Sequence, residues 1–188
     1  MANKKNIVRR IKSAVISVSD KSNLKPLLQT LNRYNVKLIS SGGTFKAIRK
    51  LGYRCLEVSD YTGFNEILDG RVKTLHPKIH AGILNKRNNN SHKREIKKNN
   101  FQNIDLVIVN FYPFEKTLNT TKNHNKIIEK IDIGGPALVR SAAKNYNDVA
   151  VITSTNQYSA LIDQLKRFKG ATKLEFRKKL SQSAFNET

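Results

Sequence analysis

Short apolar runs alternate along the chain with segments in which apolar residues recur at helical spacing. The apolar runs have the length and the β-branched content of buried strands, and they cover residues 13–18, 36–40, 53–58, 105–110 and 149–153. The helical pattern covers residues 22–34, 44–51, 127–131, 136–144, 157–168 and 172–184. Because helices separate the strands, the pattern predicts an α/β fold: a three-layer, Rossmann-like parallel sheet with helices on both faces.

No internal repeat or long linker interrupts this pattern, and 188 residues suit a single core. We therefore expect a basic N-terminal arm at residues 1–12, one α/β domain at residues 13–155 and C-terminal helices at residues 156–188. The polar segment 85–100 is predicted to be a solvated loop or a weak surface helix, because it lacks the apolar residues of a core element.

Ligands of parallel α/β folds bind at the carboxyl ends of the strands, so the residues that follow each strand are candidates for chemistry. After the second strand, Ser41, Gly42, Gly43 and Thr44 lead into a helix, an arrangement that suits a phosphate cradle of backbone N–H groups. A tight turn capped by Thr44 is the alternative. After the first strand, residues 19–21 supply a hydroxyl, a carboxylate and an ammonium, or they simply cap the next helix.

The segment 68–77 carries two cations that alternate around an apolar residue. In an extended loop, Arg71 and Lys73 project to the same side, where they would suit a substrate with a phosphate and a carbonyl. His76 and His80 are four residues apart, but Pro77 lies between them and no third ligand is evident, so no metal site is predicted.

The last two strand ends provide further candidates. Asn110 and Tyr112 offer an amide and a phenol, whereas the phenylalanines beside them suit an aromatic plug on the core. Asp132 precedes a glycine pair and a helix start, where it either serves a site or favours the helix dipole. Later on that helix, Arg140 and Lys144 share a face. If Lys144 packs against the sheet, desolvation would bring its pKa toward an acid/base range.

Composition adds a formal net charge of +21, from 35 Lys and Arg against 14 Asp and Glu. Such charge suits nucleic-acid or anion binding, but the cations are scattered and lack interleaved aromatic residues, as biased codon usage would produce. Nucleic acid is therefore the less favoured partner. The single cysteine, Cys55, indicates a reducing cytoplasm, and no apolar run is long enough to cross a membrane.

Several motifs together resemble one family: SVSDK, SSGGT, TGFNEILDGRVKTLHPKIHAGIL, NFYPF, IDIGGPALVRSAAKN and SAFNET. Their order and spacing are similar to those of the N-terminal domain of the bifunctional AICAR formyltransferase/IMP cyclohydrolase family, which has a methylglyoxal-synthase-like fold. SGGT alone is shared with the wider fold. The resemblance implies an IMP cyclohydrolase, an enzyme that closes the ring of 5-formamidoimidazole-4-carboxamide ribotide (FAICAR) to give inosine monophosphate (IMP) in the last step of de novo purine biosynthesis.

The resemblance also implies roles for individual residues. Lys73 resembles the transition-state stabiliser of the family and Lys144 its proton donor/acceptor, while Tyr112 and Asp132 match residues around the reacting carboxamide. The positions that match nucleotide-binding stretches, or that shape the base pocket, are Ser19, Asp20, Lys21, Ser41, Gly42, Gly43, Thr44, Arg71, Val72, Lys73, Thr74, Val109, Asn110, Asp132, Ile133, Gly134 and Gly135.

Cyclisation in this family implies no cofactor and no metal. The family continues beyond the position of Thr188 into a formyltransferase domain that would use 10-formyltetrahydrofolate, so we expect no formyl transfer from residues 1–188 alone. The resemblance implies a homodimer that binds FAICAR and IMP, and it implies no membrane partner. The alternatives are a methylglyoxal synthase or an effector-binding regulatory domain of the same fold, and a basic nucleic-acid-binding module.

Overall fold

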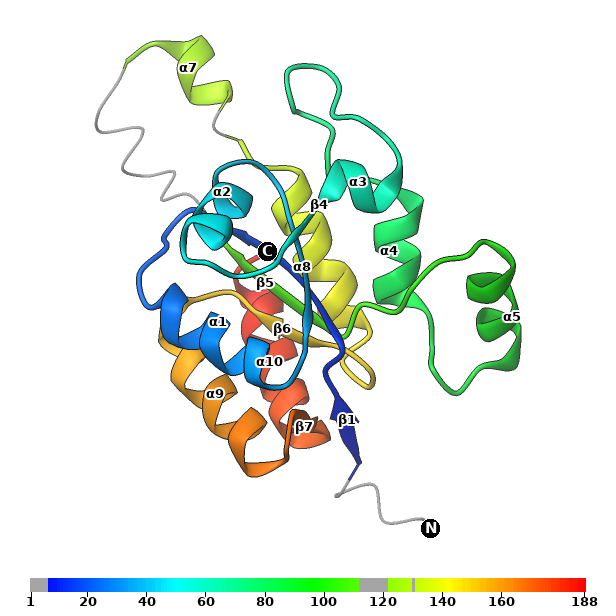
Figure 1. Ribbon diagram of the computed structural model, residues 1–188. Helices are drawn as coiled ribbons and strands as arrows, with labels where there is room; N and C mark the ends of the chain where they lie inside the picture. The colour runs from blue at the N-terminus through cyan, green and yellow to red at the C-terminus, as the bar shows by residue number, and fades with distance from the viewer. Residues whose placement is uncertain (1–6, 112–121, 130) are drawn as a thin grey trace.

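The computed structural model describes residues 7–111, 122–129 and 131–188, and its centre is a parallel sheet (Figure 1). Five strands form the sheet in the order β4-β3-β2-β5-β6. Their bounds are β2 Ser13–Val18, β3 Lys37–Ser40, β4 Leu56–Glu57, β5 Leu106–Asn110 and β6 Ala150–Ile152. The predicted parallel α/β fold is therefore confirmed.

The central strand β2 explains why the strands are such continuous apolar runs. It pairs in parallel with β3 on one side, where Ala14 lies opposite Leu38, and with β5 on the other, where Ala14 lies opposite Leu106. Because helices cover both faces of the sheet, side chains on both sides of the strand are removed from water. Val15 and Ile16 are accordingly almost fully buried.

The helices pack in two layers. Contacts join α1 to α9 on one face of the sheet, and join α8 to α4 and α10 on the other (Figure 1). The helix bounds are α1 Leu24–Arg33, α2 Gly42–Lys50, α3 Val58–Thr62, α4 Pro77–Leu84, α5 Asn90–Lys98, α7 His124–Ile128, α8 Gly134–Lys144, α9 Tyr158–Arg167 and α10 Leu174–Asn186, with a short 3₁₀ turn at Thr155–Gln157. Among the described residues, no helix is long and apolar enough to span a bilayer.

Both helices with a glycine pair begin two residues earlier than the pattern predicts. α2 begins at Gly42 rather than Thr44, and α8 begins at Gly134 rather than Pro136. The first helical turn therefore includes the glycines themselves. In segment 85–100, residues 90–98 form α5, a helix without a buried residue. Of the two predictions for this segment, the surface helix is therefore confirmed.

The N-terminal and C-terminal segments are joined to the domain. Strand β1 Val8–Arg10 pairs antiparallel with β7 Ala171–Lys173, and Ile11 is completely buried. Helix α10 packs on α8 and β6. Residues 8–11 and the last helices thus belong to the same folded unit as the sheet.

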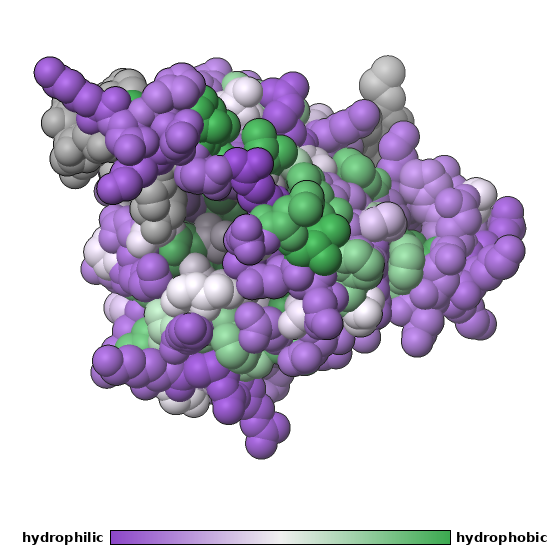
Figure 2. Space-filling view, turned by 90° about the horizontal axis from the view of Figure 1, so that it is seen from above, coloured by the Kyte–Doolittle hydropathy of each residue, from purple (hydrophilic) through white to green (hydrophobic). Residues whose placement is uncertain are grey.

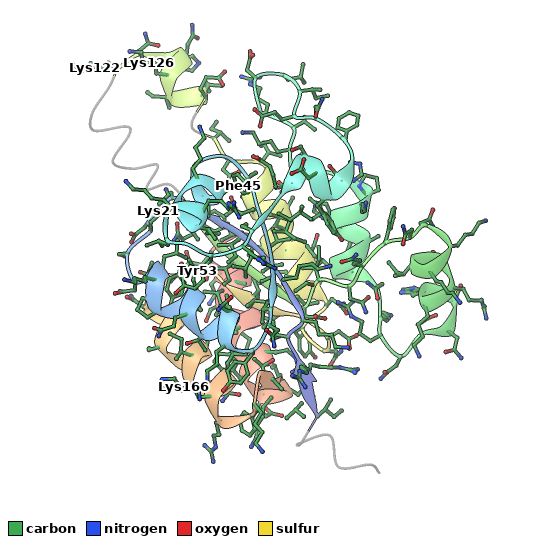
Figure 3. All side chains as sticks on the ribbon, in the orientation of Figure 1. Lys21, Phe45, Tyr53, Lys122, Lys126 and Lys166 are labelled. Atoms are coloured by element: carbon green, nitrogen blue, oxygen red, sulfur yellow. The ribbon has the colours of Figure 1, made fainter. Side chains whose placement is uncertain are left out.

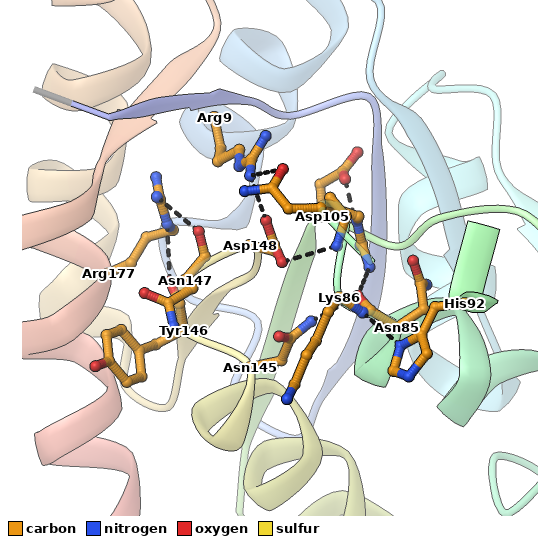
Figure 4. Close-up of polar contacts among 12 residues, drawn as sticks. Arg9, Asn85, Lys86, His92, Asp105, Asn145, Tyr146, Asn147, Asp148 and Arg177 are labelled. Atoms are coloured by element: carbon orange, nitrogen blue, oxygen red, sulfur yellow. Dashed lines mark hydrogen bonds and ion pairs between the residues drawn. The ribbon is translucent and has the colours of Figure 1, made fainter. Parts of the chain in front are cut away.

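A network of charged groups lies at the amino end of the sheet (Figure 4). Asp105 Oδ2 accepts hydrogen bonds from the backbone of Lys12 (2.9 Å) and Ser13 (3.3 Å). Asp148 lies 2.8 Å from the Arg9 guanidinium and accepts from the backbone N–H of Arg87 at 3.0 Å. The network holds the starts of β2, β5 and β6 together at the edge opposite the carboxyl ends of the strands.

Candidate active site

A cavity of about 620 Å³ lies at the carboxyl edge of the sheet, where the chemistry was expected. Figure 2 shows a view from above, with exposed apolar side chains among polar ones. Ile67, Leu68, Ile131 and Ile133 are each at least 44% exposed. The lining residues come from the end of β2, the start of α2, the 69–74 loop, the end of α7 with the segment after it, and the start of α8: Ser17, Ser41, Asp69, Gly70, Arg71, Lys73, Thr74, Ile128, Glu129, Ile131, Asp132, Ile133, Gly134 and Gly135.

The start of α8 forms one wall of this cavity, and only glycine fits there. Asp132 Oδ1 accepts a hydrogen bond of 2.9 Å from the backbone N–H of Gly135, so the carboxylate caps the helix. A Cβ on Gly134 would lie 2.6 Å from Thr74 Oγ1, and one on Gly135 would lie 2.2 Å from Asp132 Oδ2 and 3.2 Å from Val109. The glycine pair therefore lets the helix end approach Thr74 and Asp132 closely.

Arg71 and Lys73 both line the cavity, as their alternation predicted. Lys73 Nζ lies 2.7 Å from Glu66 Oε2, and Arg71 forms an ion pair with Glu129. The hydrogen bond from Arg71 lowers the pKa of the Glu129 carboxyl below its ordinary value. Arg71 is thus held by a glutamate from another segment, and Lys73 by a glutamate seven residues earlier in the chain.

Lys73 and Ser41 also line a second cavity, of about 530 Å³. Gly42 and Gly43 lie on its wall, and Gly42 has a φ of +54°, a conformation that favours glycine. The Thr44 hydroxyl donates to Val18 O (2.9 Å) and accepts from Val18 N (3.0 Å), so it ties α2 to the end of β2. Thr44 does not cap α2, because it lies inside the helix and the N-cap residue is Ser41; its hydroxyl is engaged with the end of β2 rather than directed at a ligand.

The loop at residues 19–21 is organised by one amide. Asn110 Oδ1 accepts from the N–H of Ser19 (2.7 Å), the Ser19 hydroxyl (3.0 Å) and the N–H of Asp20 (2.9 Å). Asn110 Nδ2 donates to Asp20 O (2.9 Å), and Lys21 Nζ donates to Ser19 O (3.2 Å). Asn110 thereby shapes the loop. Figure 3 shows Lys21 toward the end of the molecule that carries α2, and Lys166 toward the opposite end.

Lys144 lies away from both cavities. It stands ten residues along α8 from Gly134, about 15 Å along the helix axis at roughly 1.5 Å per residue. Ala142 and Ala143 occupy the buried side of this turn and Lys144 is exposed, so Lys144 does not pack against the sheet. Arg140 donates to Thr188 O at 3.2 Å. The acid/base role that the family resemblance implies for Lys144 stays a prediction.

Other predicted site residues lie around the cavities or outside the described chain. Ile133 is 61% exposed on the first cavity, whereas Val109 is buried beneath the start of α8 and Val72 forms a β-bridge with Ile67. Tyr112 lies outside the described residues, so its role stays a prediction.

Sequence reasoning missed several lining residues. Ser17 carries a signal, because it is a polar residue near the end of an apolar strand. Asp69 lies in a motif that was recognised for its cations alone. Glu66 and Glu129 carry no local signal, because the ion pair of Glu129 with Arg71 spans 58 residues and that of Glu66 depends on how the loop folds.

His76 and His80 both make hydrogen bonds that involve helix α4. His76 Nδ1 accepts from the N–H of Lys78 at 3.1 Å and caps α4, while His80 Nδ1 lies 3.0 Å from Ser141 Oγ on α8. Among the described residues no group of three or more His, Cys, Asp or Glu side chains is placed to hold a metal ion. Burial lowers the pKa of His80 below its ordinary value, although a hydrogen bond with the Thr74 backbone opposes this.

The fold and the cavity together define a class: an α/β domain with a glycine-rich helix start and a cation-lined cavity at the carboxyl edge of its sheet. The model of the MGS-like domain family matches residues 23–137, and the chain belongs to this family. Residues 142–188 match the model described as AICARFT/IMPCHase bienzyme.

Several curated relatives are named bifunctional purine biosynthesis protein PurH. The chain is 47% identical over 180 residues to the bifunctional purine biosynthesis protein PurH of Bradyrhizobium diazoefficiens. The matched region covers 96% of this chain and 34% of that protein. It is 52% identical over 177 residues to PurH of Prochlorococcus marinus, with coverage of 93% and 34%. The chain spans about a third of the length of these curated relatives, and it corresponds to their N-terminal part.

A solved structure is similar over nearly its whole length. The crystal structure of ForH superposes with a TM-score of 0.82 at 32% identity, over 94% of this chain and 92% of ForH. The arrangement of the sheet, the helices and the C-terminal segment is therefore shared with a chain of similar length.

The glycine wall yields a stability prediction. Gly135→Ala should lower the free energy of unfolding by about 2 kcal/mol, because the new methyl group collides with Asp132. The matched control is Gly43→Ala, where a Cβ meets nothing within 4 Å, and this variant should be neutral or stabilised by about 0.5 kcal/mol. Urea unfolding of both variants measures the difference, and equal values would contradict the packing argument.

His80 yields a pH prediction. Its pKa is lower in the folded chain than the ordinary value of about 6.5, so the unfolded chain binds the proton more readily. The stability that this neutral histidine contributes is present above about pH 6.5 and is lost as the pH falls through its folded pKa. The free energy of unfolding should therefore fall on acidification, and His80→Gln should flatten that slope. His124→Gln, on the exposed surface of α7, is the control and should retain the wild-type slope.

Proposed function

We propose that this chain is an IMP cyclohydrolase that closes the ring of FAICAR to give IMP and water. The observation that carries the proposal is the cavity in which Lys73 and Asp132 come together beside the glycine start of α8. Similarity to PurH proteins over nearly the whole chain and the match to the AICARFT/IMPCHase model support it.

The chemistry asks for charge stabilisation and proton transfer. The carboxamide nitrogen of FAICAR attacks the formyl carbon, which forms a C–N bond and turns the formyl oxygen into an oxyanion. The Lys73 ammonium stabilises that charge, and the Asp132 carboxylate, already fixed by its cap to Gly135, accepts a proton from the nitrogen. The proton taken from the nitrogen is delivered to the oxygen, and the hydroxyl then leaves as water with the N–H proton of the former formamido nitrogen, which gives the aromatic ring of IMP.

The phosphate of the nucleotide suits the start of α2. Ser41 lies on both cavities, and the N–H groups of Gly42 and Gly43 stand at the positive end of a helix. Lys21, in the loop that Asn110 organises, adds a cation. In this placement the base reaches Asp132 through the larger cavity, and Arg71 and Thr74 lie along its wall.

The proposed step balances without a redox partner, a metal or a cofactor. We propose that the reaction takes place in the cytoplasm and that the nucleotide, not a nucleic acid, is the ligand. Formyl transfer with 10-formyltetrahydrofolate would need a site beyond residues 1–188.

Turnover of FAICAR tests the proposal. The purified chain should convert FAICAR to IMP, and the absorbance of IMP measures the rate. Lys73→Ala should reduce kcat about 100-fold or more, because a charge that stabilises the oxyanion is lost. Lys166→Ala on α9, exposed at the opposite end of the molecule, is the matched control (Figure 3). The proposal fails if FAICAR is not turned over. Formation of methylglyoxal from dihydroxyacetone phosphate, or salt-resistant nucleic-acid binding, would replace it with another function.

The position of Lys144 bears on the proposed homodimer. If Lys144 is the proton donor/acceptor, about 15 Å of helix separates it from the cavity of its own chain, so a second copy has to supply it. Lys144→Ala and Lys73→Ala should each be nearly inactive, and an equimolar mixture of the two should recover about a quarter of wild-type turnover. Half of randomly assembled dimers are mixed, and each mixed dimer then has one intact site. No recovery in the mixture would contradict a lysine supplied by the partner.

A further inference from the structure

The loop that carries Lys73 is a tight hairpin. Ile67 and Val72 form an antiparallel bridge, with Ile67 N–H to Val72 O at 3.3 Å and Val72 N–H to Ile67 O at 3.4 Å. Leu68, Asp69 and Gly70, the first three of the four residues between them, have positive φ, between 54° and 84°. The next residues outward from the bridge are Glu66 and Lys73. Side chains alternate along paired strands, so these two share one face of the hairpin.

The resulting ion pair sits over the turn. Lys73 Nζ lies 2.7 Å from Glu66 Oε2, and the lysine side chain runs across Gly70, where a Cβ would lie 2.5 Å from Lys73 Cε. The Glu66 side chain is 58% exposed and that of Lys73 is 30% exposed. An ion pair this exposed contributes little to folding. The main effect of the ion pair is therefore on the position of the Lys73 ammonium and not on the stability of the fold.

The pair marks the boundary between the two cavities. Lys73 lines both, whereas Glu66 lines the 530 Å³ cavity alone. An ammonium has three N–H donors, and Glu66 accepts from one side only, so donors remain for the 620 Å³ cavity that contains Asp132. Without the carboxylate, a flexible four-carbon side chain has no fixed direction.

We propose that Glu66 is a positioning residue: it holds the Lys73 ammonium at the junction of the two cavities, with its remaining donors toward the reacting end of the substrate. The inference rests on the proposed cyclohydrolase function. Glu66 touches no reacting atom, and it acts through Lys73 alone.

Separate kcat and KM values for FAICAR test the role. Glu66→Ala should lower kcat about 10-fold and change KM less than about twofold, because misdirected charge slows the reaction while phosphate binding at α2 is untouched. Glu66→Gln keeps an oxygen that accepts the lysine N–H and should stay within about threefold of wild type. The melting temperature should not change in either variant. Glu95→Ala, which removes an exposed glutamate from the surface helix α5, is the matched control.

A double variant distinguishes an effect of Glu66 through Lys73 from a purely structural effect, because only the first disappears from kcat when Lys73 is removed. In a Lys73→Ala background, Glu66→Ala should have no further effect on kcat, because the residue through which it acts is gone. An unchanged kcat in Glu66→Ala, or additive losses in the double variant, would overturn the proposal. So would a fall in KM, which would mean that the carboxylate competes with the substrate for Lys73. If wild-type protein turns over FAICAR, such results refute the role of Glu66 alone; absence of wild-type turnover refutes the proposed function.

Discussion

The close approach of the α8 start to the loop below it is the constraint on which the site depends. Gly134 and Gly135 leave no room for a side chain between the helix and the groups that it meets, Thr74 and Asp132. That contact joins the loop of Arg71 and Lys73 to the helix end, and it places the capping carboxylate of Asp132 on the same cavity as the two cations. A larger residue at either glycine would push apart the groups that the proposed chemistry needs close together.

The two edges of the sheet use charge in different ways. At the amino edge, Asp105 and Asp148 are nearly buried and accept from backbone N–H groups and arginines, so they act as fixed joints between strand starts. At the carboxyl edge, Glu66 and Glu129 are exposed, and each holds one cation of a loop. With 14 acidic against 35 basic residues, carboxylates are scarce in this chain. Those that form ion pairs in the described residues hold either a strand start or a cation of the 69–74 loop.

Much of the fold follows from local pattern. Residues 105–110 were predicted as a strand and form β5 at Leu106–Asn110, because a short run of apolar, β-branched residues favours a buried strand. The pairing of β1 with β7 could not be predicted in this way, since each strand has three residues and their partners are more than 150 positions apart. Helix α4 was missed because its segment, with its histidines and lysine, was considered for chemistry rather than for packing.

In the site, too, local features could be predicted from the sequence and long-range contacts could not. Residues at strand ends and glycine pairs were found because backbone geometry demands them, and Ser41, Lys73, Asp132 and Gly135 do line one cavity. The use of each side chain depends on its partners, which no local pattern contains. Asn110 was predicted to bind the nucleotide; in the structure its amide is engaged with the loop at Ser19 and Asp20 and sets the shape of that loop. Lys144 shares α8 with the site and yet lies at the far end of that helix, because ten residues of helical rise, about 15 Å, separate it from Gly134.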